Sequence, residues 1–211
     1  TEPAQLSLRQ RLKFLAKDTA LYGGAKALSL AVGFITFPVI ARHFSVADYG
    51  LIDLLSTVGA FLATVIVFGQ DSAIGRYFYE YTATQERRAL ISQSLLIQVV
   101  VCVAVCILAL AGAPWVISML GEGSRDDLSL LMLLVILQVP FNVFLGFAQN
   151  LLKWSFARTE FLVISLGSTL ASAGAIVGGI LLFDFGIVEV FYTYLIIRLL
   201  FGCLGLHYCR K

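Results

Sequence analysis

The sequence predicts an all-α fold, a polytopic membrane protein whose six transmembrane helices form one bundle. Six apolar stretches follow one another, each about 20 residues or more, which at about 1.5 Å per residue crosses a hydrocarbon core of about 30 Å. Hydrophobic residues make up 59% of the chain and charged residues 13%, whereas an ordinary soluble domain has about 25% charged residues. Lys and Arg lie mainly in alternate gaps between the stretches, which is typical of polytopic membrane proteins.

The predicted spans occupy residues 18–41, 47–69, 89–113, 128–150, 159–183 and 187–207. A basic amphipathic segment, 1–17, precedes them and a short tail, 208–211, follows them. The longest polar gap, about 70–88, is too short for a water-soluble domain. The chain begins with Thr1 and stops just after the sixth span, so we expect a fragment of a longer protein or a processed one.

The cations between the spans predict the orientation. One set of gaps holds most of them, namely Arg9, Arg11, Lys13, Lys17, Arg76, Arg87, Arg88, Lys153, Arg158, Arg210 and Lys211. The opposite set holds only Arg42 and Arg125. Because loops rich in Lys and Arg stay in the cytoplasm, both ends of the chain are predicted to be cytoplasmic.

The segment before the first span has one apolar face, formed by Leu8, Leu12 and Leu15 at helical spacing, and is otherwise basic. It either lies on an anionic leaflet or simply extends the first helix. Within the first span, Gly23, Gly24 and Pro38 weaken the helix, and bends in transporter helices arise in this way. A bend at a proline also occurs in bundles that do not transport.

A capping box formed by Ser45 and Asp48 is expected to start the second helix. In the polar gap that follows this span, three tyrosines suit the membrane interface. Arg76 and Glu80 would be i, i+4 partners if a helix continues there. We interpret this gap as an interfacial anchor.

Cys102 and Cys106 share one face of the third helix. A metal or redox pair is one interpretation, but no His or carboxylate lies near them in that span, so packing is favoured. His43 and His207 fall on opposite sides of the membrane and cannot form one site. In the fifth span, Gly174 and Gly178 form a G-x-x-x-G motif. This motif favours close packing inside the bundle, with dimerisation as the alternative.

Two cations lie inside spans, Lys26 and Arg198, and counting from opposite ends places both near the bilayer centre. An ionisable group there costs about 2.5–3.5 kcal/mol. Two such cations without an obvious acid indicate an anionic guest, and phosphate suits the Arg fork and the Lys point charge. The alternative is a structural ion pair of Asp53 with one of them.

No catalytic motif is present: there is no Ser-His-Asp set, no H-E-x-x-H, no C-x-x-C and no P-loop. We therefore expect that the chain is not an enzyme and that it binds no cofactor, no metal and no nucleic acid. Any transport would be driven by a gradient or by substrate flux.

Four runs in the first 80 residues carry a family resemblance: 17–23 (KDTALYG), 37–45 (FPVIARHFS), 48–54 (DYGLIDL) and 69–80 (GQDSAIGRYFYE). They resemble the start of the Wzx-type polysaccharide flippases, in the multidrug/oligosaccharidyl-lipid/polysaccharide transporter superfamily. The resemblance implies two six-helix lobes around a cavity that opens alternately to each side, with this chain as the N-terminal lobe. It also implies a substrate of undecaprenyl diphosphate bearing an oligosaccharide, as in lipopolysaccharide synthesis, moved across the bacterial inner membrane.

On this interpretation Lys26 and Arg198, with Asp53 nearby, line the cavity and attract the diphosphate, while Asp71 and Arg76 form a gate at the inner mouth. The implied partners are the lipid-linked oligosaccharide, membrane lipids and polysaccharide polymerase machinery. Two alternatives stay open: a multidrug extruder of the same superfamily, whose guests are commonly cationic, and a membrane scaffold without transport, whose buried charges would all be paired. Glycan contacts would come from dispersed polar residues, namely Gln98, Gln138, Asn142, Gln149 and Asn150.

Overall fold

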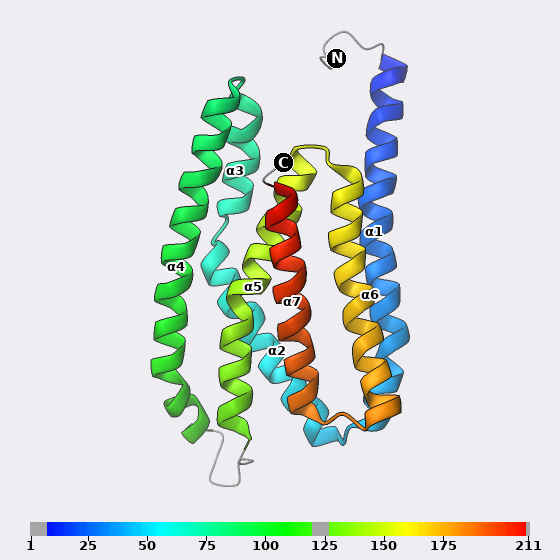
Figure 1. Ribbon diagram of the computed structural model, residues 1–211, viewed down its shortest axis with the longest axis vertical. Helices are drawn as coiled ribbons and strands as arrows, with labels where there is room; N and C mark the ends of the chain where they lie inside the picture. Colours follow the sequence, from blue (N-terminus) through cyan, green and yellow to red (C-terminus); the bar gives the residue numbers. More distant parts are fainter. Residues whose placement is uncertain (1–7, 120–126, 210–211) are drawn as a thin grey trace.

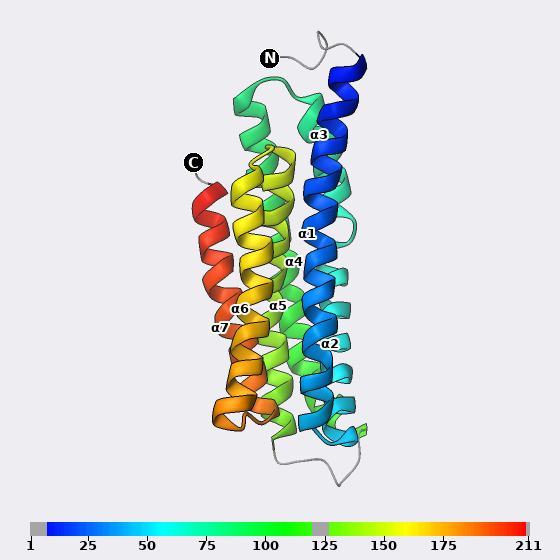
Figure 2. The same cartoon turned by 90° about the vertical axis from the view of Figure 1, so that its right-hand side faces the viewer.

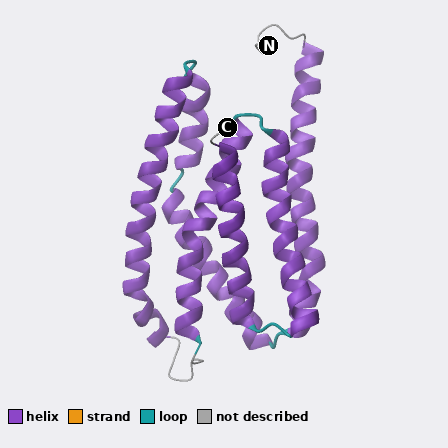
Figure 3. Ribbon diagram, viewed as in Figure 1, coloured by secondary structure: helices purple, strands orange, loops and turns teal. Residues whose placement is uncertain are grey.

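The computed structural model describes residues 8–119 and 127–209, of which 93% are helical and none is in a strand (Figure 3). The helices are α1 (Leu8–His43), α2 (Val46–Val67), α3 (Gln70–Glu80), α4 (Thr84–Met119), α5 (Leu128–Trp154), α6 (Arg158–Phe183) and α7 (Ile187–Cys209). Because α2 and α3 belong to one apolar segment, Val46–Glu80, the described part has six segments long and apolar enough to span a membrane. The predicted all-α membrane fold is confirmed.

The helices run side by side with α5 at the centre, where it contacts α7, α2, α4 and α6 (Figures 1 and 2). The first turn of α1, the last turn of α7 and the α3–α4 and α5–α6 turns lie at one end of the bundle. We call this the basic end, because many of the cations lie there, among them Lys17, Arg87, Arg88, Lys153 and Arg158. The α1–α2 and α6–α7 turns lie at the opposite end.

The buried core follows α5 from one end to the other. Near the opposite end, Leu131 of α5 packs with Leu55 of α2 and Phe191 of α7. Near the basic end, Phe147 of α5 packs with Phe78 of α3. Between transmembrane helices such packing stabilises through van der Waals contact, since lipid tails are as apolar as the side chains they replace.

Helix α1 is continuous over 36 residues and packs mainly on α6. It already begins at Leu8, so the described part of the basic N-terminal segment is an extension of the first helix, and Pro38 lies inside the helix without ending it. Residues 1–7 and 210–211 lie outside the described residues. After α1, the Ser45 hydroxyl accepts a hydrogen bond from the Asp48 N–H at 3.2 Å, so the predicted cap of the second helix is confirmed.

The sequence left open whether a helix continues through residues 70–88. Most of this gap is helical, because α3 and the first turn of α4 fill it, and the spans predicted at 18–41 and 89–113 are the middles of longer helices. Polar residues stop a hydropathy pattern at the membrane surface, but they do not stop backbone hydrogen bonding, so a helix can continue into water.

A sharp break separates α2 from α3. Phe68 and Gly69 have φ angles of 36° and 76°, so both adopt the left-handed conformation, which favours glycine and costs other residues about 1–2 kcal/mol. Across the break, the Gln70 amide donates a 2.7 Å hydrogen bond to the backbone carbonyl of Ser94 on α4. The break lets α2 pack on α5 while α3 also packs on α4.

Small residues of α6 serve two different surfaces. A Cβ at Gly167 would come within 2.8 Å of the Phe201 ring, so this glycine lets α6 and α7 approach closely. At Gly174 and Gly178, however, a Cβ would meet no atom within 4 Å. The G-x-x-x-G therefore faces open space in the described part, so the prediction that it packs inside the bundle is wrong, and the dimerisation alternative stays a prediction.

The cysteine and histidine predictions agree with the structure. Cys102 is buried against Ile66 and Val139, so it packs like a small apolar residue. His43 is the last residue of α1, at the end of the bundle opposite the basic end, and its Nε2 lies 2.9 Å from the Phe185 carbonyl oxygen. His207 lies near the end of α7, at the basic end.

Candidate functional site

Arg198 of α7 lies between two cavities inside the bundle. The first has a volume of about 290 Å³ and is bounded by α1, α5, α6 and α7. The second has a volume of about 180 Å³ and is bounded by α2, α5 and α7. Three side chains line both cavities, Asn142, Tyr194 and Arg198. We call this pair of cavities the Arg198 site.

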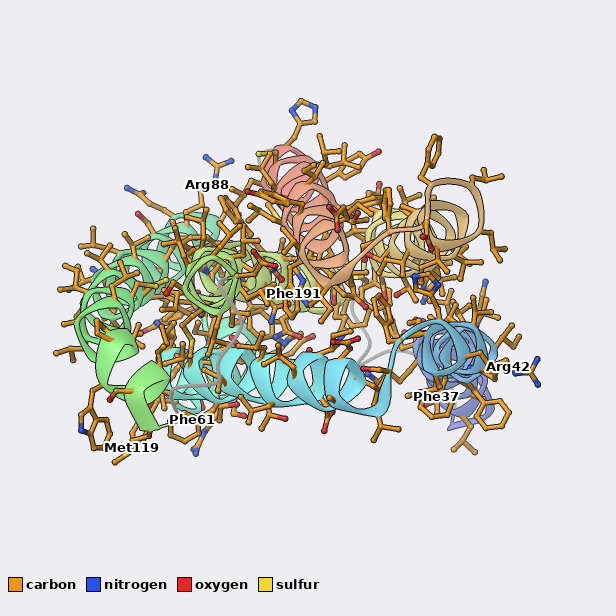
Figure 4. The ribbon with its side chains drawn as sticks, turned by 90° about the horizontal axis from the view of Figure 1, so that it is seen from below. Phe37, Arg42, Phe61, Arg88, Met119 and Phe191 are labelled. Carbon is orange, nitrogen blue, oxygen red and sulfur yellow. The ribbon has the colours of Figure 1, made fainter. Side chains whose placement is uncertain are left out.

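Two side chains and one backbone carbonyl hold the guanidinium in place. Arg198 Nη1 donates a 3.1 Å hydrogen bond to Gln138 Oε1, and Gln138 Nε2 donates in turn to the Phe191 carbonyl oxygen at 3.0 Å. The Arg198 Cζ lies 5.3 Å from the centre of the Tyr194 ring, a cation–π arrangement. Figure 4 shows Phe191 in the space between α7 and α2.

No carboxylate of the described residues lies within 4 Å of Arg198. A guanidinium has five N–H donors, and Gln138 accepts from only one nitrogen. A cation in such a low-dielectric site is stabilised by any anion that can enter. The Arg198 site can therefore bind a phosphate or carboxylate through the donors that the protein leaves free.

Five serine and threonine hydroxyl groups line the larger cavity. They come from one face of α1 and one face of α6, namely Ser29, Thr36, Ser168, Thr169 and Ser172. Thr169 and Ser29 lie 3.4 Å apart, oxygen to oxygen, across the two helices. Hydroxyls both donate and accept, so this wall can hydrogen-bond to phosphate oxygens or to sugar hydroxyls.

The structure does not bring Lys26 and Asp53 into the Arg198 site. Lys26 is exposed and lies on α1 about one turn closer to the basic end than Ser29. Its ammonium group is near enough to Lys153 for the two charges to repel. Asp53 is exposed on α2 and makes no ion pair with Lys26 or Arg198.

A second polar cluster lies at the basic end, between α3 and α5. The Asn150 amide donates a 2.7 Å hydrogen bond to Asp71 Oδ2, and the Lys153 ammonium donates to Asn150 Oδ1 at 3.4 Å. The other carboxylate oxygen, Asp71 Oδ1, is buried without a hydrogen-bond partner in the described part. We call these three residues the Asp71 cluster, and their free acceptor can take a proton or a donor from a guest.

Arg76 does not join the Asp71 cluster. The two residues are five positions apart on α3, which turns them about 140° from each other. Arg76 is exposed and forms the predicted pair with Glu80 at 3.3 Å, which contributes little because the pair is solvated. The predicted gate residues therefore lie on different faces of α3.

An ion pair that the sequence patterns did not indicate joins α1 to α6. Arg158 Nη2 lies 2.7 Å from Asp18 Oδ1, and only 12% of the Asp18 side chain is exposed. The Tyr22 ring, one turn along α1, packs edge-on against Phe161 with centres 5.0 Å apart. The only signal in the sequence was an acid at the very start of the first span, because its partner is 140 positions away.

The dispersed polar residues fall into distinct places. Gln138 and Asn142 lie at the Arg198 site, and Asn150 belongs to the Asp71 cluster. Gln98 is 1% exposed in α4, lines neither of the two cavities and has no hydrogen-bond partner in the described part. Gln149 is partly buried and lines neither of the two cavities. Tyr194 was missed, although its position one turn before Arg198 is the signal that could have indicated it.

Comparison with known proteins gives one match. The family model described as polysaccharide biosynthesis protein matches residues 15–211. No curated protein and no solved structure matches the chain. The matched region contains the Arg198 site, the Asp71 cluster and all six membrane-spanning segments. This multi-pass helical chain therefore belongs to the polysaccharide biosynthesis protein family.

Proposed function

We propose that the chain is the N-terminal lobe of a Wzx-like flippase, which moves undecaprenyl-diphosphate-linked oligosaccharide from the cytoplasmic to the periplasmic leaflet of the bacterial inner membrane. The observation that carries the proposal is Arg198, a cation inside a membrane bundle without a carboxylate partner in the described part. The family match supports the pathway. The cation supports the diphosphate as the group that is recognised.

The Arg198 site has room for one part of such a substrate. Cavities of about 290 and 180 Å³ suit a phosphate group or a single sugar, and the polyprenyl chain would stay in lipid. Arg198 would hold the phosphate by its free N–H donors, with Asn142 beside it. The hydroxyls of α1 and α6 would bind oxygens of the phosphate or of the first sugar.

Lys26 and Asp71 belong to the entry of the substrate on this proposal. Both lie toward the basic end, the side of the proposed cytoplasmic leaflet. Lys26 is exposed on α1, so it is available to attract the diphosphate before Arg198 receives it. The Asp71 cluster would open and close the inner mouth, and exposed Arg76 would contact lipid headgroups there. Asp53, exposed on α2, would lie on the path toward the outer leaflet.

Two features argue against the alternatives. A multidrug extruder for cationic guests would be expected to have an acid in its cavity, whereas Arg198 places a cation there. A scaffold would pair all of its buried charges, as Asp18 and Arg158 do, whereas the described partners of Arg198, Gln138 and Tyr194, are both neutral. Neither alternative accounts for the free donors of Arg198.

Substitution of Arg198 in the complete protein tests the proposal. In a flippase-deficient strain, Arg198→Ala should abolish glycan export, while Arg198→Lys should keep on the order of a tenth of it, because the charge remains and the planar fork is lost. Arg42→Ala, an exposed arginine at the opposite end, is the matched control and should export normally. Membrane abundance is measured by immunoblot. Normal export by Arg198→Ala at normal abundance would contradict the proposal.

A further inference from the structure

A groove follows the face of the bundle that is opposite α2. Figure 1 shows α4 and α7 on either side of α5 on this face, and Figure 4 shows α2 on the other side of the bundle. Two cavities lie along the groove, of about 430 and 490 Å³. They share Ile91 of α4, Leu151 of α5 and Cys209 of α7, so they form one continuous depression, which we call the α4–α7 groove.

The deeper part of the groove is apolar. Its walls are Leu95 of α4 and Leu206 of α7, its floor is Phe147 of α5, and His207 of α7 also lines it. From Cys209 to Cys203 on α7, this part runs about 9 Å along the helix, away from the basic end. The groove lies in membrane-spanning segments, so in the membrane its natural occupant is an acyl chain.

The end of the groove nearest the basic end, which we call its head, is lined by side chains of both signs of charge. Arg87 and Arg88 of α4 line it on one side, and Glu160 of α6 lines it on the other. The Arg87 guanidinium lies 5.0 Å from the centre of the Phe78 ring, and its Nε donates a 2.8 Å hydrogen bond to the Tyr81 carbonyl oxygen. This arginine is therefore already oriented, and its two terminal nitrogens have no hydrogen-bond partner among the described residues.

Arg88 and Glu160 complete the head without neutralising each other. Figure 4 shows the Arg88 side chain extending from α4 on the same side of the bundle as α7. Neither residue has an ion-pair partner in the described part. Two guanidinium groups and one carboxylate thus face one cavity, and Thr84 and Ser155 add hydroxyls to its wall.

We propose that the α4–α7 groove binds phosphatidylethanolamine from the leaflet at the basic end. The phosphate would lie between Arg87 and Arg88, the ammonium would donate to Glu160, and one acyl chain would lie along Leu95 and Phe147. A choline headgroup has no N–H to donate to Glu160, and a glycerol headgroup has no cation for it. The three charges of the head complement only a headgroup that carries both signs and can donate.

Native mass spectrometry of the purified protein, delipidated and then given equal amounts of phosphatidylethanolamine, phosphatidylcholine and phosphatidylglycerol, tests the proposal. The wild-type chain should retain phosphatidylethanolamine over the other two by about tenfold, the size expected for one charge-assisted hydrogen bond. Glu160→Gln should remove the preference over phosphatidylglycerol while phospholipid is still bound. Arg88→Gln should lower the retention of all three lipids several-fold.

Two further variants separate binding from folding. Cys203→Trp fills the apolar part of the groove and should lower lipid retention without touching the charged head, while Arg42→Gln, at the opposite end, should change nothing. Helix content of each variant is checked by circular dichroism. Equal retention of the three lipids by the wild type, or an unchanged lipid preference in Glu160→Gln, would overturn the proposal. So would a dimer that Cys203→Trp abolishes, because a second copy of the chain would then occupy the groove.

Discussion

At the residue scale, the charged side chains inside the bundle have two kinds of partner, an opposite charge or neutral groups. Asp18 and Arg158 neutralise each other between α1 and α6, so this ion pair stabilises the packing of the two helices. Arg198 is held by Gln138 and Tyr194, which are both neutral. These two orient the guanidinium and leave its charge uncompensated. A buried cation without a counter-ion favours anion binding, because the bound anion neutralises its charge.

The ion pair of α1 and α6 predicts a stability effect. Asp18→Asn should lower the free energy of unfolding by about 2 kcal/mol, because it strands the Arg158 charge; the value is below that of a fully buried pair, since 28% of the Arg158 side chain is exposed. The double variant with Arg158→Gln should recover part of the loss, because no charge is then left alone. Thermal unfolding in detergent measures both, and an Asp18→Asn protein as stable as the wild type would contradict the prediction.

Sequence reasoning found half of the Arg198 site. Arg198 and the polar residues Gln138 and Asn142 stand out in an apolar chain by composition alone. Their contact could not be predicted, because it joins positions 60 residues apart on α5 and α7. The same holds for Asp71 and Asn150, which are 79 positions apart. Lys26 was expected beside Arg198 because counting along helices gives depth, but it does not tell which cavity a side chain lines.

At the element scale, the break between α2 and α3 is the main departure from straight helices. Gly69 should not tolerate a side chain, because its φ of 76° is left-handed. We expect Gly69→Ala to lower the free energy of unfolding by about 1 kcal/mol. Gly112→Ala is the matched control, since it lies inside α4 with nothing within 4 Å of its Cβ, and it should stabilise by about 0.5–1 kcal/mol. Two changes of the same sign would show that backbone conformation is not the cause.

Helix α3 also carries the proposed gate. Arg76→Glu should slow transport while substrate binding stays close to wild type, because Arg76 is exposed and lies far from the Arg198 site on the other face of α3 from Asp71. Transport is measured as glycan export per molecule of protein, and binding by retention of lipid-linked oligosaccharide on the purified protein. If binding falls as much as the transport rate, Arg76 contacts the substrate and the gate assignment is wrong.

The elements themselves were predicted unevenly. The six membrane-spanning segments follow from hydropathy, because any segment that spans lipid must be both apolar and helical. The extension of α4 beyond the membrane was missed because its residues are polar, whereas the extension of α1 and a helix at α3 were raised from the sequence but left open. Their helices are maintained by backbone hydrogen bonds and by tertiary contacts such as the packing of Phe78 on Phe147, and neither leaves a hydropathy signal.

At the scale of the whole molecule, the two faces of the bundle differ in chemistry. On one side of α5 the Arg198 site opens between α1, α2 and α7, with a cation and hydroxyls inside the membrane. On the other side the α4–α7 groove is mostly apolar, with Arg87, Arg88 and Glu160 at its head and His207 on the wall farther along. This division fits a lobe with one face toward its substrate and one toward lipid, and α5 forms the wall between them.

The orientation of the whole bundle is the last prediction. An even number of spans puts both ends of the chain on one side, and the excess of Lys and Arg at the basic end predicts that this side is the cytoplasm. In a background without the four native cysteines, Gln85→Cys in the first turn of α4 should react with a membrane-impermeant maleimide only after the inner membrane is opened. Asp127→Cys, exposed at the start of α5, should react in cells whose outer membrane alone is permeable. The two positions lie at opposite ends of the same bundle, so each serves as the control for the other. Labelling of position 85 from the periplasm would invert the topology, and with it the direction in which the Asp71 cluster and Arg198 would meet the substrate.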